Sequence, residues 1–167
     1  MFAATETNGM IDRGFKPRVY LDTNVFNRAF ESEPEEAKNL QEVLAFLEQD
    51  RNFAVTSELT LAEVLAPPWN RIGRTKPNKR QFYLKLIVWS GFIDLRPVSR
   101  EILISTADWR AHERVKLPDA IHIVTAVETG CAFLLSSDRD TRRLLEQMTH
   151  FSPDPPRIRA LMDRLRG

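Results

Sequence analysis

The chain has 167 residues, of which 43% are hydrophobic and 28% are charged, and its formal net charge is +1. This length suits one domain with an ordinary apolar core, and the longest apolar run falls well short of the ~20 residues that span a bilayer. We therefore expect a cytoplasmic protein without membrane contact, in which a single cysteine, Cys131, allows neither an internal disulfide nor a cysteine-based zinc site.

The N-terminal segment, residues 1–16, is polar and lacks the apolar stretch of a signal peptide, so it is expected to be a disordered tail. Met1 and Met10 are both possible translation starts, and the sequence leaves the choice open. The remaining residues, 17–167, are predicted to form a single domain. Strand-like and helix-like segments alternate along this domain almost without interruption.

Short apolar runs rich in β-formers predict strands, and longer segments with helical spacing predict helices. The predicted strands span residues 18–21, 53–56, 92–95 and 132–135. The predicted helices span residues 23–30, 34–49, 57–65, 80–90, 99–112, 118–128, 140–148 and 157–166. Thr23 or Asn24 is expected to cap the first helix. A basic loop over 69–79 and an extended, proline-rich stretch over 151–156 complete the chain. This alternation favours an α/β fold with helices on both faces of a parallel sheet.

The helix predicted over 34–49 carries apolar residues at positions i, i+3, i+4 and i+7, namely Leu40, Val43, Leu44 and Leu47. Together with Phe46, these residues exceed what one buried helix face needs. Two interpretations stay open for this helix. Its apolar residues either pack in the core or form a surface for a second copy of the chain or for another protein.

Four acidic residues lie where an α/β fold gathers functional groups, at or near the carboxyl ends of strands. Asp22 directly follows the first strand, and Asp138 lies three residues after the fourth. Glu63 is on the helix that leaves the second strand, and Asp119 is in the first turn of a later helix. Hard divalent cations such as Mg²⁺ and Mn²⁺ bind oxygen ligands of this kind together with water and phosphate. Each acid alone reads as a helix cap or a surface residue, but the set predicts a metal site.

Neighbouring polar residues have roles that follow from this site. Asn24 and Ser136 can orient the metal ligands or an attacking water by hydrogen bonding. Asp119, at a helix N-terminus, is expected to be held in its ionised form by the helix dipole. His122 lies three residues after Asp119, and it is either a structural residue or a contact to the substrate.

Four segments of the chain together resemble the motifs of PIN domains. They are residues 19–26, 57–64, 117–126 and 134–140, and they occur in the order that the family shows. The resemblance covers about residues 18–155. It implies a three-layer α/β/α sandwich around a central, mostly parallel sheet of four to five strands. It also implies cleavage of RNA phosphodiester bonds that depends on Mg²⁺ or Mn²⁺.

Carried over position by position, the resemblance implies specific site residues. The implied catalytic residues are Asp22, Glu63, Asp119 and Asp138. The implied metal ligands are Asp22, Asp119 and Asp138. The implied supporting residues are Asn24, Ser136 and Asp140. Asp140 is also the alternative to Asp138 as the fourth acid.

The size of the chain resembles the VapC branch of this family, the toxin halves of bacterial toxin–antitoxin pairs. This resemblance implies a protein antitoxin as a partner and a homodimer as the assembly. Basic residues outside the four motifs suit contacts with the phosphates of single-stranded RNA, and these are Arg71, Arg74, Lys76, Lys79 and Arg80. A solvated basic loop and a site for an acidic protein are the alternatives for this cluster.

Two other functions match parts of the pattern. An Asp-Thr-Asn sequence after a strand also suits an aspartyl-phosphate phosphatase of the haloacid dehalogenase type, with Asp22 as the nucleophile. That family has a second aspartate where Asn24 stands, which argues against it. The other function is a PIN fold that binds a partner without catalysis. All four acids are present, so the sequence gives this alternative no support.

Overall fold

The computed structural model describes residues 16–49, 53–66, 77–138 and 148–166. Within them, five strands form one parallel sheet in the order β3-β2-β1-β4-β5. The strands are β1 Val19–Leu21, β2 Ala54–Ser57, β3 Ile93–Arg96, β4 Phe133–Leu135 and β5 Thr149–Phe151. Nearly all of the predicted N-terminal tail, most of the predicted basic loop and most of the helix predicted over 140–148 lie outside the described residues.

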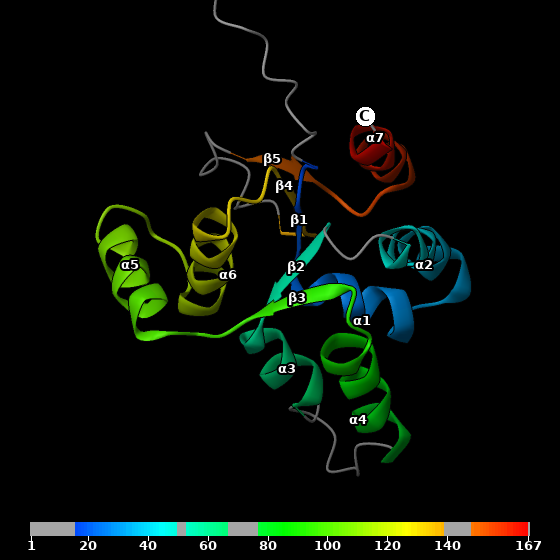
Figure 1. Cartoon of the computed structure of the whole chain (residues 1–167), viewed down its shortest axis with the longest axis horizontal. Coiled ribbons are helices and arrows are strands. Elements are labelled where there is room, and N and C mark those ends of the chain that lie inside the picture. Colours follow the sequence, from blue (N-terminus) through cyan, green and yellow to red (C-terminus); the bar gives the residue numbers. More distant parts are fainter. Residues whose placement is uncertain (1–15, 50–52, 67–76, 139–147, 167) are drawn as a thin grey trace, which may run out of the picture.

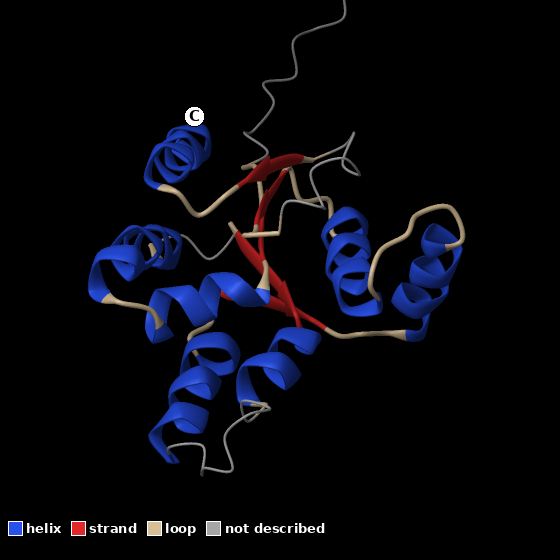
Figure 2. Ribbon diagram, turned by 180° about the vertical axis from the view of Figure 1, so that it is seen from behind, coloured by secondary structure: helices blue, strands red, loops and turns tan. Residues whose placement is uncertain are grey.

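Helices cover both faces of the sheet and make a three-layer α/β/α sandwich (Figures 1 and 2). On one face lies α6, with α5 packed against it, and on the other lie α1, α2 and α7. The helices are α1 Thr23–Glu31, α2 Pro34–Glu48, α3 Glu58–Leu65, α4 Pro77–Tyr83, α5 Arg100–Arg110, α6 Leu117–Glu128 and α7 Pro155–Arg166. The predicted fold class is confirmed. No helix in the described part of the chain is long and apolar enough to cross a membrane.

The central strand, β1, is buried along its whole length and sends its side chains to both faces. Val19 and Leu21 join the large core cluster with α1 and α2. Tyr20 belongs to a second cluster, with Ala126 of α6 and Leu134 of β4. The chain order reverses at β1, because β2 pairs with one of its edges and β4 with the other. Open α/β sheets bind ligands at such a switch point, outside the carboxyl ends of the strands.

The apolar residues of α2 settle one open alternative. Leu40, Val43, Leu44 and Leu47 are buried in the large core cluster. Phe46 stacks on Phe53 with ring centroids 6.2 Å apart and packs against the same cluster. The core interpretation of this helix is therefore correct, and its buried side chains are not available to a second copy.

Three local features differ from the prediction. β5 was not predicted, because it has only three residues and includes His150, so it lacks an apolar run. Arg157 of α7 donates to the carbonyl oxygen of His150 at 2.6 Å. The helix predicted from residue 80 begins at Pro77, whose fixed φ suits a first turn, and continues into the π-helix η1, Leu84–Trp89. The cap of α1 is Asp22 rather than either of the two residues after it.

Candidate active site

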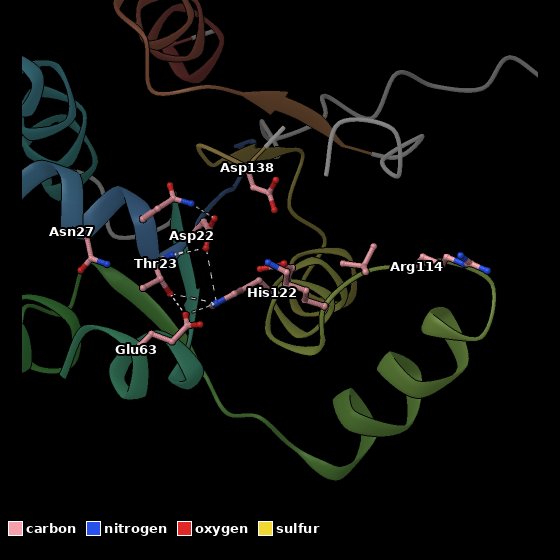
Figure 3. A pocket seen from close by; sticks show the side chains of 11 residues that line it. Asp22, Thr23, Asn27, Glu63, Arg114, His122 and Asp138 are labelled. Carbon is pink, nitrogen blue, oxygen red and sulfur yellow. Dashed lines mark hydrogen bonds and ion pairs between the residues drawn. The ribbon is translucent and has the colours of Figure 1, made fainter. Parts of the chain in front are cut away.

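The four predicted acids line one pocket at the carboxyl end of the sheet, beside the switch point (Figure 3). The cavity has a volume of about 610 Å³. Its walls come from the β1–α1 junction, from α3, from the start of α6 and the connection before it, and from the segment after β4. The lining residues are Asp22, Thr23, Asn24, Asn27, Glu63, Arg114, Val115, Lys116, Asp119, His122 and Asp138.

Asp22 accepts hydrogen bonds on both of its carboxylate oxygens. It follows the last residue of β1 and caps α1 with an extended backbone, and its Oδ1 accepts from the backbone N–H of Thr23 at 2.7 Å. Oδ2 accepts from the hydroxyl of Ser136 at 2.5 Å and from the side-chain amide of Asn24. The side chain is 16% exposed, so one edge of the fixed carboxylate stays open to the pocket.

Asn24 and Ser136 tie the β1–α1 junction to the segment after β4. The Ser136 hydroxyl donates to Asp22 and accepts from the Asn24 amide at 3.2 Å and from the backbone N–H of Asp138 at 3.0 Å. The side-chain carbonyl of Asn24 accepts from the backbone N–H and the hydroxyl of Ser137, at 2.9 and 3.0 Å. Because the Ser136 hydroxyl is buried and engaged in these bonds, it orients a carboxylate rather than a water in the pocket.

Glu63 enters the pocket from α3 (Figure 3). Its Oε2 accepts from the Thr23 hydroxyl and from Nε2 of His122, the latter at 2.9 Å. Burial opposes the ionisation of Glu63, but these hydrogen bonds outweigh burial, and the pKa of Glu63 lies below its ordinary value. Glu63 is therefore a carboxylate at neutral pH. His122 is itself buried, and its Nδ1 lies 2.7 Å from the hydroxyl of Tyr20.

Asp119 and Asp138 line the same pocket, from the first turn of α6 and from the segment after β4. Burial raises the pKa of Asp119, and the charges of Asp138 and Asp22 raise it further, against opposing effects of His122 and Lys116. The predicted effect of the helix N-terminus on Asp119 stays a prediction, and burial and the two neighbouring aspartates act against it. The three aspartates therefore repel one another, and a bound cation would reduce this repulsion.

The donor set fits a hydrated divalent cation. In the described ranges, no three acidic, histidine or cysteine side chains converge closely enough to hold a metal ion. Mg²⁺ commonly takes one or two carboxylates directly and keeps several of its waters, so it does not need such a cage. Asp22, Asp119 and Asp138 offer oxygen donors around one cavity, and the raised pKa of Asp119 marks negative charge that is not neutralised. Oxygen donors of this kind suit Mg²⁺ or Mn²⁺.

Two basic residues at the pocket were missed by the sequence analysis. Arg114 and Lys116 line it from the connection between α5 and α6, and both are exposed. The available signal was their position, five and three residues before Asp119. That spacing does not say which way the connection faces, because only the packing of α5 on α6 decides it.

The predicted basic cluster lies elsewhere or outside the described residues. Lys79 forms an ion pair with Glu31 of α1 at 2.8 Å, and Arg80 is exposed on α4. Neither residue lines this pocket. The predicted residues that lie outside the described ranges are Arg71, Arg74, Lys76 and Asp140.

Comparison with known proteins gives one family. Residues 19–146 match the family model described as the PIN domain, a span that contains all four acids. A search of the curated proteins found no match.

Solved structures share the fold over most of their length. A toxin–antitoxin complex from Klebsiella pneumoniae is 22% identical, with a TM-score of 0.56, and the match covers 81% of this chain and 98% of that chain. FitAcB from Neisseria gonorrhoeae is 17% identical, with a TM-score of 0.58 and coverage of 81% and 97%. VapBC2 from Rickettsia felis, bound to a DNA fragment from its promoter, is 13% identical, with a TM-score of 0.57 and coverage of 80% and 97%. At these identities the likeness is one of fold.

Proposed function

Because the chain belongs to the PIN domain family, we propose that it is a metal-dependent endoribonuclease and the toxin of a toxin–antitoxin pair. One observation carries the proposal: acids from four separate parts of the chain line a single pocket at the switch point of the sheet. Acids that only capped helices or covered the surface would have no reason to converge on one cavity. The acids are Asp22, Glu63, Asp119 and Asp138.

The proposed chemistry divides the work among the pocket residues. Asp22, Asp119 and Asp138 are the proposed ligands of Mg²⁺ or Mn²⁺, which would polarise the phosphate and make a water more acidic. Ser136 keeps the Asp22 carboxylate oriented through the bond at 2.5 Å. Glu63, ionised at neutral pH, accepts a proton from the attacking water through its carboxylate.

RNA is the proposed substrate on the strength of the family. Arg114 and Lys116 line the same pocket as the acids and offer positive charge to phosphates beside the one that is cleaved. Lys79 and Arg80, with the other basic residues of 71–80, remain predicted contacts to a longer strand. Binding through phosphates weakens as salt rises, so the KM for RNA is expected to increase with salt concentration. We expect this protein to act in the cytoplasm, where cellular RNA is found.

A cleavage assay tests the nuclease. Purified protein is incubated with fluorescently labelled single-stranded RNA and Mn²⁺, and the expected result is endonucleolytic fragments that disappear when EDTA is added. Asp119→Asn removes a proposed ligand and is expected to abolish cleavage. Asp108→Asn, at an exposed position on α5, is the matched control and is expected to cleave like the unaltered protein. Equal cleavage in EDTA, or by the Asp119 variant, would contradict the proposed mechanism.

The toxin role is supported by the solved structures of the same fold, which include a toxin–antitoxin complex. Expression of the chain alone in a bacterium is expected to arrest growth, and Asp22→Asn is expected to relieve the arrest. Co-expression with the product of a small reading frame immediately upstream is expected to relieve it too, and the two proteins should purify together. Growth arrest that persists with the Asp22 variant would separate toxicity from cleavage.

A homodimer stays a prediction, but α2 no longer offers the surface for it. The leucines of α2 are buried, so a dimer needs another apolar surface. Leu103 and Ile104 of α5 are 46% and 56% exposed and are adjacent in sequence. Light scattering on the purified protein gives the assembly directly, and Ile104→Glu is the variant expected to shift a dimer that uses α5 toward the monomer.

The alternative functions find less support. A phosphatase of the haloacid dehalogenase type has a second aspartate where Asn24 stands, and here the Asn24 amide donates to Asp22. A binding module without catalysis would not need four acids around one cavity, where burial and then the charges of Asp138 and Asp22 raise the pKa of Asp119. Calorimetric titration with Mn²⁺ separates the nuclease from the binding module without catalysis. The nuclease is expected to bind the ion, and the binding module is not.

A further inference from the structure

A buried histidine connects the central strand to the acidic pocket. His122 lies on α6, which packs on the face of the sheet to which Tyr20 of β1 points. Nδ1 of His122 is 2.7 Å from the Tyr20 hydroxyl, and Nε2 is 2.9 Å from Oε2 of Glu63. Nε2 is also 3.9 Å from Oδ1 of Asp22 (Figure 3). The imidazole therefore bridges a buried phenol and two carboxylates.

The partners of His122 decide which nitrogen carries the proton. Glu63 is ionised and can only accept hydrogen bonds, so Nε2 of His122 must be the donor in their contact. In a neutral imidazole, Nδ1 then accepts, and the Tyr20 hydroxyl is the donor to it. Burial raises the pKa of Tyr20 well above its ordinary value, and the Asp22 charge adds to this, so the phenol keeps the proton that it donates.

A second donor reaches the same oxygen of Glu63. Thr56 donates its hydroxyl proton to the Leu21 carbonyl oxygen at 2.7 Å, so Thr60 is the donor in the 2.9 Å contact between the two threonines. Because the Thr60 proton goes to Thr56, Thr60 has no proton to donate to Thr23. Thr23 donates its own proton to Oε2 of Glu63. Thr23 and His122 therefore both bond Oε2, which leaves Oε1 as the oxygen of Glu63 for the pocket.

A residue that only fills the core would not need the hydrogen bonds that His122 makes. His122 is surrounded along α6 by buried apolar residues, and burying an imidazole among them is unfavourable unless both nitrogens are bonded. Both are bonded here, and the bond at Nε2 ends on one of the proposed active acids.

We infer that Tyr20 and His122 are positioning residues for Glu63. The Glu63 carboxylate and the Tyr20 hydroxyl together select the Nε2–H tautomer of His122, and the bond from Tyr20 to Nδ1 holds the ring in place. His122 then holds Glu63 by Oε2 so that Oε1 faces the substrate. This inference rests on the proposed function, in which Glu63 acts on the attacking water. Tyr20 is not among the residues that line the pocket, and His122 lines it but is only 4% exposed, so loss of their contact should lower kcat more than it raises KM.

The tautomer is measured without metal and without RNA. Imidazole ¹⁵N chemical shifts distinguish Nε2–H from Nδ1–H, and the chain has three histidines, so His122→Gln assigns the signal by its disappearance. In the metal-free protein, at a pH where the spectrum shows a neutral imidazole, His122 is expected to be an Nε2–H tautomer. In Tyr20→Phe the proton is expected to stay on Nε2, because Glu63 still accepts it, and the Nδ1 signal is expected to move toward the shift of a nitrogen without a hydrogen bond. A proton on Nδ1 in the unaltered protein, or no change in Tyr20→Phe, would overturn the inference.

Cleavage kinetics test the consequence for Glu63. Tyr20→Phe is expected to lower kcat by roughly 10-fold with a nearly unchanged KM, as for other residues that orient an active-site side chain by hydrogen bonding. Tyr83→Phe is the matched control: Tyr83 is also buried and donates to a glutamate, Glu31, at 2.7 Å, but it does not line the pocket. It should lose stability and keep kcat. A kcat for Tyr20→Phe equal to that of Tyr83→Phe would overturn the positioning role.

Variants of His122 separate the hydrogen bond from the shape of the ring. His122→Gln retains an N–H that can reach Glu63 and should recover most of the activity, whereas His122→Leu packs well but cannot donate and should lose at least as much as Tyr20→Phe. Equal activity of the Gln and Leu variants would contradict the inference. If the unaltered protein cuts no RNA with Mn²⁺, the proposed function fails, and the tautomer measurement still decides whether Tyr20 controls His122.

Discussion

Replacing Ser136 by alanine removes the hydroxyl that holds the first acid of the pocket. Ser136 is 1% exposed, and its hydroxyl donates to Asp22 at 2.5 Å while accepting from Asn24 at 3.2 Å and from the Asp138 backbone N–H at 3.0 Å. A hydrogen bond to a charged group contributes about 1.5–3 kcal/mol, and a donor left without its acceptor in a buried site adds to the loss. We therefore expect Ser136→Ala to lower the free energy of unfolding by about 3 kcal/mol.

In a domain of this size, about 1 kcal/mol shifts Tm by roughly 2–4 °C, so the expected drop is roughly 6–12 °C. Cleavage should fall as well, because Asp22 loses the bond that fixes its orientation. Ser137→Ala is the matched control, since Asn24 accepts from the backbone N–H of Ser137 as well as from its hydroxyl and keeps the backbone bond. Its loss should stay within about 1 kcal/mol. If urea titration gave both variants the same stability, and both cleaved RNA alike, the account of Asp22 would be wrong.

Three further predictions concern charge and the core. Asp119→Asn is expected to raise Tm in EDTA, because burial and neighbouring aspartates disfavour the ionised side chain, and to abolish the rise in Tm that Mn²⁺ gives the unaltered protein. Burial opposes the ionisation of Glu31, but Lys79 and the Tyr83 hydroxyl outweigh burial and lower the pKa of Glu31. The stability that ionised Glu31 contributes is present above about pH 4 and is lost as pH falls further. Glu31→Gln should therefore flatten the acid side of the Tm–pH curve. Leu40→Ala should cost about 3 kcal/mol at every protein concentration, whereas a concentration-dependent loss would indicate a dimer surface instead of the core.

The sequence was informative where one local pattern carried both the structure and the chemistry. The run that forms β1 is apolar up to Leu21 and turns polar at Asp22, so the strand and the acid at its end could be predicted together. Pro118 and Asp119 mark the start of α6 in the same way. Features of this kind depend on neighbours in the chain, and they were found.

Features set by distant contacts could not be predicted. His122 lies in an apolar helix segment, and its partners Tyr20 and Glu63 are 102 and 59 residues away along the chain. Arg114 reaches the pocket only because α5 packs on α6. The ionisation of Asp119 follows the same rule: the helix N-terminus was visible in the sequence, but the burial and the two aspartates that raise its pKa were not. β5, which includes His150, exists because β4 offers it a partner.

The order of strands in the sheet has a consequence for how the protein is made. β1 is completed on one side by β2, early in the chain, but on the other side by β4, which begins at Phe133 of 167 residues. The hydroxyl of Ser136 and the carboxylate of Asp138 follow directly. A chain that is still being synthesised therefore holds Asp22 without the bond from Ser136 and without Asp138 until β4 and the segment after it have been made. If the pocket is the nuclease that we propose, a copy that stops before β4 lacks Ser136 and Asp138, and we expect it not to cleave RNA.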